Sequence, residues 1–114
     1  MEDCIFCKIV KGEIPCEKVY EDDMVLSFKD INPEAPAHVL IIPKKHISSL
    51  NEVSEENSKV IAHIFVTAKE IVKKLGVDGT GYRIVSNCGE DGGQTVHHIH
   101  FHVLGGRSLQ WPPG

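Results

Sequence analysis

One segment, residues 96–104, constrains the fold more than any other part of the chain. Its histidines alternate with apolar residues, in the order His98, Ile99, His100, Phe101, His102 and Val103. Successive side chains of a β-strand point to opposite faces, so an extended chain places the imidazoles on one face and the apolar groups on the other. The pattern predicts a last strand, Val96–Leu104, with one buried face and one face open to chemistry.

A second pattern predicts one long amphipathic helix. Apolar residues recur at steps of three and four, which aligns them in one stripe: Val60, Ile61, Ile64, Phe65, Ala68, Ile71, Val72 and Leu75. Ser54 is a suitable N-cap, and Gly76 suits the left-handed residue that ends a helix. We therefore expect a helix from near Ser54 to Gly76 that covers the apolar face of a sheet.

The remaining elements are short. Four apolar runs bounded by turns are predicted as strands: Glu17–Glu21, Met24–Lys29, Ala37–Pro43 and Tyr82–Asn87. Cys4–Lys11 is predicted as a short helix that stops at Gly12. Five strands and one long helix with short connections indicate an α+β fold, in which residues 1–114 form one domain around an antiparallel sheet.

Composition excludes several classes of function. The 114 residues carry a formal net charge of -4, without the clustered basic face that nucleic-acid binding requires. No stretch approaches 18 apolar residues, and no signal peptide is evident, so we expect a cytoplasmic protein that does not enter a membrane. Thiols stay reduced in that compartment, which makes the four cysteines metal ligands or free thiols.

Three imidazoles on one strand face would lie about 7 Å apart from one to the next. Neighbouring rings disfavour one another's protonation, so one ring should stay neutral near pH 7 and serve as a nucleophile or base. Alternate strand positions are also good ligand geometry for zinc. The spacing alone leaves covalent catalysis, a three-histidine zinc hydrolase and a row of solvent-facing histidines open.

Residues 98–104 resemble the signature of the histidine triad (HIT) family, and the resemblance covers nearly the whole chain. Further segments resemble its nucleotide-binding, HINT-like branch: Ile14–Pro15, Phe28–Ile31, Pro36–His38, Ile42–Ile47, Gly92–Thr95 and Trp111–Gly114. Trp111–Gly114 favours this branch over the dinucleoside polyphosphate hydrolase and uridylyltransferase branches.

The resemblance implies a mechanism. His100 would attack the α-phosphorus of a nucleotide conjugate and form a nucleotidyl-histidine that water then hydrolyses. The implied substrates are purine nucleoside phosphoramidates and aminoacyl adenylates, and no cofactor takes part. His102 would contact the phosphate and assist the leaving group, whereas His98 and His38 would hold and polarise the site. A nucleotide-binding regulatory module with negligible turnover would need the same pocket.

The resemblance also implies contacts to the nucleotide and to a partner. Asn87 and Thr95 would meet ribose or phosphate, and a second copy in a homodimer would receive the segment that carries Trp111. From chemistry, Asp30 could accept ribose hydroxyls or cap its own loop, and the pair Gly92–Gly93 could offer amides to phosphate or form a simple turn. Four apolar residues could sandwich the base or be plain core: Phe6, Ile9, Phe28 and Ile31.

Cys4 and Cys7 have the spacing of half a structural zinc site. His46 and His97 are available to complete it, and His97 should point away from His98. Some bacterial members of the resembled family carry two such cysteines with these histidine positions as zinc ligands, which implies a purely structural metal. A thiol pair without metal, or a redox motif, remains the alternative.

Overall fold

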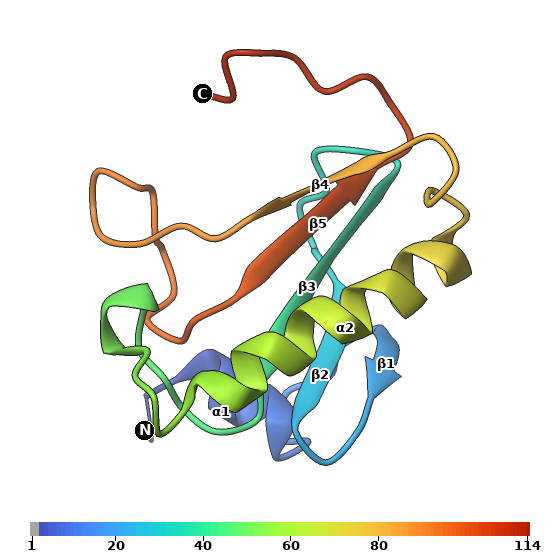
Figure 1. The fold of residues 1–114 in the computed structure, drawn as a ribbon. Helices are drawn as coiled ribbons and strands as arrows, with labels where there is room; N and C mark the ends of the chain where they lie inside the picture. The colour runs from blue at the N-terminus through green and yellow to red at the C-terminus, as the bar shows by residue number, and fades with distance from the viewer. Residues whose placement is uncertain (1–2) are drawn as a thin grey trace.

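The computed structural model describes residues 3–114, which form one antiparallel sheet with helices on both sides (Figure 1). The strand order is β1-β2-β3-β5-β4. In chain order the elements are α1 (Ile5–Val10), β1 (Lys18–Glu21), β2 (Val25–Lys29), β3 (Ala37–Pro43), the 3-10 turn η1 (Leu50–Glu52), α2 (Ser58–Leu75), β4 (Tyr82–Val85) and β5 (Phe101–Gly105). The predicted fold class is therefore confirmed, including the long helix and the short N-terminal helix.

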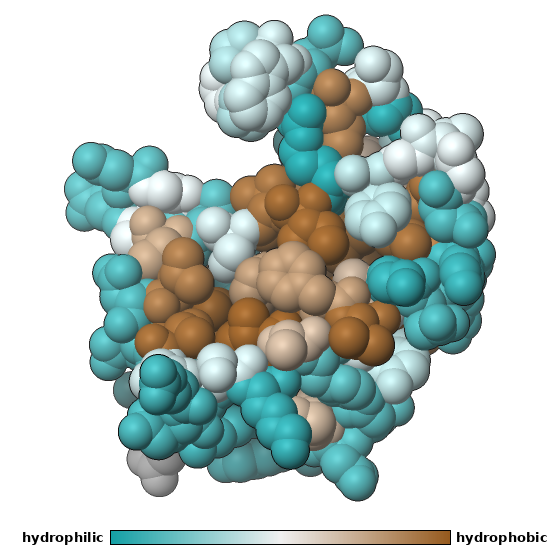
Figure 2. Space-filling model, viewed as in Figure 1, coloured by the Kyte–Doolittle hydropathy of each residue, from teal (hydrophilic) through white to brown (hydrophobic). Residues whose placement is uncertain are grey.

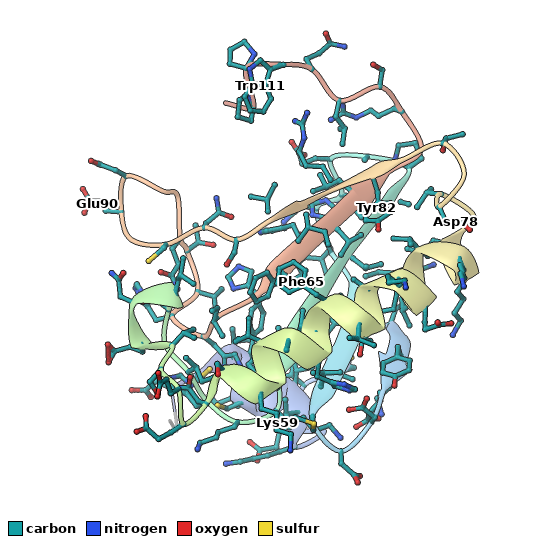
Figure 3. The ribbon with its side chains drawn as sticks, in the orientation of Figure 1. Lys59, Phe65, Asp78, Tyr82, Glu90 and Trp111 are labelled. Atoms are coloured by element: carbon teal, nitrogen blue, oxygen red, sulfur yellow. The ribbon has the colours of Figure 1, made fainter. Side chains whose placement is uncertain are left out.

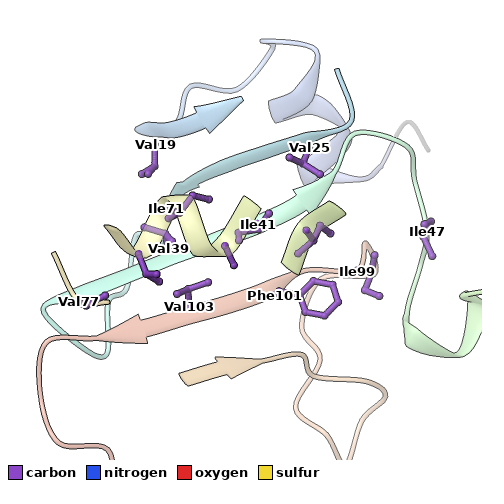
Figure 4. Close-up of a cluster of buried hydrophobic side chains, with 13 residues drawn as sticks. Val19, Val25, Val39, Ile41, Ile47, Ile71, Val77, Ile99, Phe101 and Val103 are labelled. Carbon is purple, nitrogen blue, oxygen red and sulfur yellow. The ribbon is translucent and has the colours of Figure 1, made fainter. Parts of the chain in front are cut away.

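The sheet separates two apolar clusters, and β3 contributes to both because its side chains alternate. Val39 and Ile41 pack beneath α2, in a cluster that Figure 4 shows. Leu40 and Ile42 pack on the opposite face with residues of α1. The predicted division of the histidine segment is also confirmed on its apolar side, since the α2 cluster includes Ile99, Phe101 and Val103.

The start of α2 differs from the prediction. The helix begins at Ser58, with Asn57 at the N-cap position, rather than near Ser54. The Asn57 side chain accepts a hydrogen bond from the Ser54 amide at 2.7 Å, which closes a separate turn before the helix. At the other end Gly76 has a φ of 75°, the left-handed conformation predicted there. No helix within residues 3–114 is long and apolar enough to cross a membrane.

The last strand is shorter than predicted, and this change shapes the site. β5 begins at Phe101, so His98 and His100 precede the ladder. The Ile99 amide donates to the carbonyl of Ile47 at 2.6 Å, in the connection that follows β3. The hydroxyl of Ser86, just past the end of β4, donates to the His100 carbonyl at 3.0 Å. Side-chain and loop contacts thus hold residues 98–100 where ladder pairing was expected.

Candidate active site and thiol–imidazole cluster

A cavity of about 250 Å³ opens on the α1 face of the sheet, and His100 and His102 line it. It brings together most of the residues predicted to contact substrate, namely Phe6, Ile9, Phe28, Asp30, Ile31 and Thr95. Its other lining residues are Ile5, Lys29, Asn32, Leu40 and Val96. Apolar walls with a few polar groups are typical of a small-molecule site.

The geometry around His100 determines which of its ring nitrogens is free. Its Nδ1 lies 2.7 Å from the carbonyl oxygen of His98. A carbonyl only accepts hydrogen bonds, so Nδ1 carries the hydrogen and donates it. In the neutral ring Nε2 then has no proton, and its lone pair is available as a nucleophile. The edge-to-face ring of Phe6, 5.1 Å away between centroids, packs against this imidazole.

His102 forms a chain of hydrogen bonds with His38. The Glu34 amide donates to Nδ1 of His38 at 3.0 Å, and Nε2 of His38 lies 2.9 Å from Nδ1 of His102. Because an amide can only donate, Nε2 of His38 carries the hydrogen, and Nε2 of neutral His102 carries the next one. Burial, together with His100 and His38, lowers the pKa of His102 to about 4.

Asp30 supplies the carboxylate of this end of the site. Its Oδ2 lies 3.4 Å from Nε2 of His38 and 3.8 Å from Nδ1 of His102. Its Oδ1 accepts from the Asn32 amide at 2.8 Å, so the loop-capping role weighed from sequence is present as well. One carboxylate therefore orders its loop and faces the cavity at the same time.

Cys4, Cys7, His46 and His98 form a second group, whose donor atoms all lie within 4.8 Å of one another. The Cys4 sulfur is 3.3 Å from Nδ1 of His98, and the Cys7 sulfur is 3.4 Å from Nδ1 of His46. Sulfur and nitrogen bound to one tetrahedral zinc lie about 3.5 Å apart, given its bond lengths. Two thiols and two imidazoles at these distances fit a structural zinc ion.

His98 is held in the form that a metal ligand requires. Its Nε2 lies 2.8 Å from the Pro43 carbonyl and therefore donates, which leaves the Nδ1 lone pair facing the sulfurs. Burial lowers the pKa of His98 to about 4, so the ring is neutral near pH 7. Burial likewise raises the pKa of the Cys7 thiol.

The structure corrects the predicted ligand set, because His98 rather than His97 completes the group. His97 is exposed and lies outside it. His97 lines a cavity beside Cys4 and His46, but residues 96–98 form bends rather than a strand, and it is His98 whose ring nitrogen reaches the sulfurs.

His98, His100 and His102 lie on the side of the segment opposite the α2 cluster, as alternation predicted, but they belong to different groups of side chains. Phe6 stands edge-on to both His98 and His100, with ring centroids 5.8 and 5.1 Å away. Within residues 3–114, the two groups able to hold a metal contain one of these histidines each, His98 in one and His102 in the other. This geometry does not support a hydrolase in which all three histidines bind one zinc ion.

Three predicted contact residues lie apart from the cavity lining. Asn87 donates to the Gly92 carbonyl at 2.6 Å, and the Gly93 amide donates to Glu90 at 3.0 Å, so both groups are used within their loop. A Cβ at Gly92 would lie 2.3 Å from the Cys88 carbonyl, which explains glycine there. Trp111 is 78% exposed, and its ring lies 6.0 Å from the guanidinium of Arg83.

Sequence reasoning did not single out several residues that hold or line the site, among them Leu40, Ser86 and Glu34. Leu40 lines the cavity and pairs with His102 in the β3–β5 register, a position that alternation from His38 could have revealed. Ser86 contacts the His100 carbonyl from beyond the end of β4, whereas the Glu34 amide reaches the His38 ring four residues along the chain. No local pattern marks either contact.

Comparison with known proteins places the chain in a family. The HIT domain matches residues 11–109. An uncharacterized HIT-like protein of Synechococcus elongatus is 51% identical over 99% of this chain and 98% of its own length. A HIT family hydrolase from Legionella pneumophila superimposes with a TM-score of 0.96 at 51% identity, covering 98% of this chain and all (100%) of the other. A histidine triad protein from Clostridium difficile gives 0.94 at 52% identity, covering 96% of each chain. The chain belongs to the HIT family.

Proposed function

We propose that this protein hydrolyses the phosphorus–nitrogen bond of purine nucleoside 5′-phosphoramidates, or the acyl phosphate bond of aminoacyl adenylates, through His100. One observation carries the proposal: the hydrogen bond from Nδ1 of His100 to the His98 carbonyl leaves Nε2 as the unprotonated nitrogen of a cavity-lining ring. The HIT family hydrolase from Legionella pneumophila has the same fold and is 51% identical in sequence to this chain, which supports a hydrolase.

The reaction proceeds in two steps on a phosphoramidate. Nε2 of His100 forms a bond to the α-phosphorus, the bond to the amine breaks, and the departing amine takes up one proton. That proton comes from solvent, while Nε2–H of His102 donates a hydrogen bond toward the phosphoryl oxygens and the hydrogen bond from His38 holds the His102 ring in place. Water then attacks the phosphorus, the bond to His100 breaks, and the proton from water replaces the one given to the amine.

The walls of the cavity suit a nucleotide. Phe6 and Phe28 are in edge-to-face contact at 5.6 Å and, with Ile9 and Ile31, offer an apolar site for the purine. Asp30 and Thr95 line the same cavity and provide hydrogen-bonding groups for ribose and phosphate. We assign Asn87, Gly93 and Trp111 to the substrate only after rearrangement or assembly, since none lines the cavity of the single chain.

Zinc is the metal that best fits Cys4, Cys7, His46 and His98. Four protein ligands leave no open position, so a metal there cross-links α1, the connection after β3 and residue 98 rather than activating water. The reduced state of these thiols suits the cytoplasm, which we include in the proposal.

Replacing the nucleophile tests the reaction. We expect His100→Ala to lower kcat on an adenosine phosphoramidate by at least about 10³-fold while the protein stays folded. Rapid acid quench of the wild type should show an adenylate adduct that His100→Ala lacks. His97→Ala, which alters an exposed neighbour outside the cavity, is the matched control and should retain turnover. Equal turnover by wild type and His100→Ala would refute the assignment, and nucleotide binding without turnover would favour a regulatory module.

We also propose a homodimer formed through β4 and α2. β4 is an edge strand, with backbone groups free to pair with another strand. Phe65 of α2 and Tyr82 of β4 itself are both exposed. Apolar side chains gather on the face of the molecule that carries these two residues (Figures 2 and 3). A self-complementary surface of this kind fits a second copy about a two-fold axis.

Light scattering tests the dimer. The wild type should have twice the chain mass at micromolar concentration, and Phe65→Asp should halve it. A monomeric wild type would refute this assembly.

A further inference from the structure

The nucleophile and the thiol–imidazole cluster are joined by one residue. The side chain of His98 contacts Cys4 and Cys7 through Nδ1, and the backbone carbonyl of the same residue accepts the hydrogen bond from Nδ1 of His100. The carbonyl sets both the orientation of the His100 ring and the nitrogen that remains free. Any displacement of residue 98 is therefore passed directly to the reacting atom.

The ring of Phe6 makes a second connection. Phe6 lies in α1, one residue before Cys7, and its edge-to-face contacts reach both His98 and His100. The Cys4 sulfur also accepts a hydrogen bond from the Cys7 amide at the start of α1. The two cysteines thus hold the helix that supports the nucleophile from the other side.

The cavity that contains His100 and a cavity beside the cluster share part of their lining. A second cavity, of about 420 Å³, lies beside Cys4 and His46. Ile5, Thr95 and Val96 line this cavity and also the one that contains His100. Closing the cluster around an ion would therefore order residues that border the substrate.

The nucleophile needs such support because it lies outside the sheet. β5 begins after His100, and β4 ends before Ser86, so the sheet does not set the position of residues 96–100. The bonds from Ile99 to Ile47 and from Ser86 to His100 hold the backbone. The His98 side chain, with both ring nitrogens engaged, is the buried anchor of this stretch.

We propose that Cys4, Cys7, His46 and His98, when they hold a metal ion, position the His100 imidazole through the His98 carbonyl and the Phe6 ring. The chemical part of this inference rests on the proposed function. Without the ion, the two thiols and the His98 ring are free to repack, and the carbonyl moves with residue 98. A misplacement of about 1 Å at a reacting group lowers turnover by about 10²-fold.

Metal removal and return in the wild type is the first experiment. We expect chelation to lower kcat by about 10–100-fold with KM nearly unchanged, because the interaction lost is one that holds the nucleophile. Hydrogen exchange of residues 96–101 should accelerate, and adding zinc should restore both properties. Unchanged kcat and exchange on zinc removal, or failure of the protein to take up any metal, would overturn the proposal.

A matched pair of ligand variants separates positioning from general stability. His46→Asn and His98→Asn each remove one imidazole from the cluster, but only residue 98 touches His100. At a zinc concentration high enough to load both variants, we expect His98→Asn to lower kcat at least tenfold further than His46→Asn. Equal kcat values in the two zinc-loaded variants would overturn the proposal.

Two further measurements cover the remaining outcomes. If the zinc-free protein unfolds, Phe6→Leu in the zinc-loaded protein removes the ring contacts to His98 and His100 as well as part of the purine site. Positioning predicts a fall in kcat at saturating substrate with unchanged zinc content, whereas a loss of purine binding alone would raise KM. If the wild type turns over no phosphoramidate, the proposed function fails. Zinc-dependent exchange at residues 96–101, measured with and without AMP, then still decides whether the cluster orders the segment.

Discussion

His98 and His102 are the same residue type at the two ends of one short segment, and they differ in their partners. His98 is fully buried (0% exposed) between two thiols and a carbonyl, whereas the side chain of His102 is 21% exposed and contacts another imidazole near a carboxylate. Burial is the first cause of a lowered pKa in both, to about 4. The common shift does not reveal their roles, because soft sulfur neighbours favour a metal and the imidazole–carboxylate neighbours favour proton handling.

The largest effect is expected from replacing His102, the residue at one end of the compared segment. His102→Gln keeps a hydrogen-bonding side chain but removes the imidazole, so we expect kcat to fall by about 10²–10³-fold with little change in melting temperature. Steady-state kinetics on an adenosine phosphoramidate, paired with thermal melting, measures both. Turnover equal to that of the wild type would show that the two ends do not differ in this way.

The next largest effect is expected from removing one of the cysteines that contact His98. Cys7→Ala removes a ligand from the cluster, and the protein should lose its zinc. The free energy of unfolding should fall by about 4 kcal/mol, the stabilisation expected when free metal exceeds its Kd a thousandfold. Elemental analysis and denaturant unfolding with and without zinc provide the readouts. A variant as stable as the wild type in zinc buffer would contradict the assignment.

A pH series sharpens the comparison. His102 has a pKa of about 4 in the folded protein against 6.5 ordinarily, so the unfolded chain binds the extra proton between these values. Its contribution to stability is complete above pH 6.5 and is lost as the pH falls toward 4. Because the His102 side chain is partly exposed, we expect a reduced effect. Between pH 6.5 and 4, the free energy of unfolding of the wild type should fall by about 2 kcal/mol more than that of His102→Gln. Parallel stability curves for the two proteins would contradict this expectation.

The smallest effect lies on the other face of the sheet, where Asp22 accepts hydrogen bonds from Tyr20 at 2.7 Å and His63 at 2.6 Å. Burial opposes ionisation of Asp22, but these bonds and two backbone amides hold its pKa below the ordinary value. Asp22→Asn weakens the hydrogen bonds between α2 and the β1–β2 turn, so the free energy of unfolding should fall by about 1 kcal/mol. Turnover and zinc content should not change, and a loss of either would show that the faces are coupled.

The spacing of apolar residues was enough to predict the elements in which one apolar pattern runs over the whole length of the helix or strand. The stripe from Val60 to Leu75 predicts α2, and its end at Gly76 follows from backbone conformation. Ala37–Pro43 was predicted with its observed bounds, because a buried strand between prolines has clear limits. The error at Ser54 arose because either Ser54 or Asn57 can cap a helix locally, and the turn that joins them decides.

The candidate site was predicted less completely. The alternation predicted which side chains pack beneath α2, and Ile99, Phe101 and Val103 do so. It also placed His98 on the same side as His100, and the Phe6 ring contacts both, but it did not reveal that the thiols of α1 pair with His98. The choice of His97 as a metal ligand failed for the same reason, since the side on which α1 places its cysteines is not a local property.

The amino-acid sequence by itself determined the sheet, the long helix, the apolar side of the histidine segment and the pairing of Cys4 with Cys7, because each follows from spacing along the chain. Tertiary structure alone decided that His98 joins the thiols and that His38 donates to His102. These choices depend on groups up to 94 residues apart, as for Cys4 and His98, whose meeting is determined by packing of the whole domain.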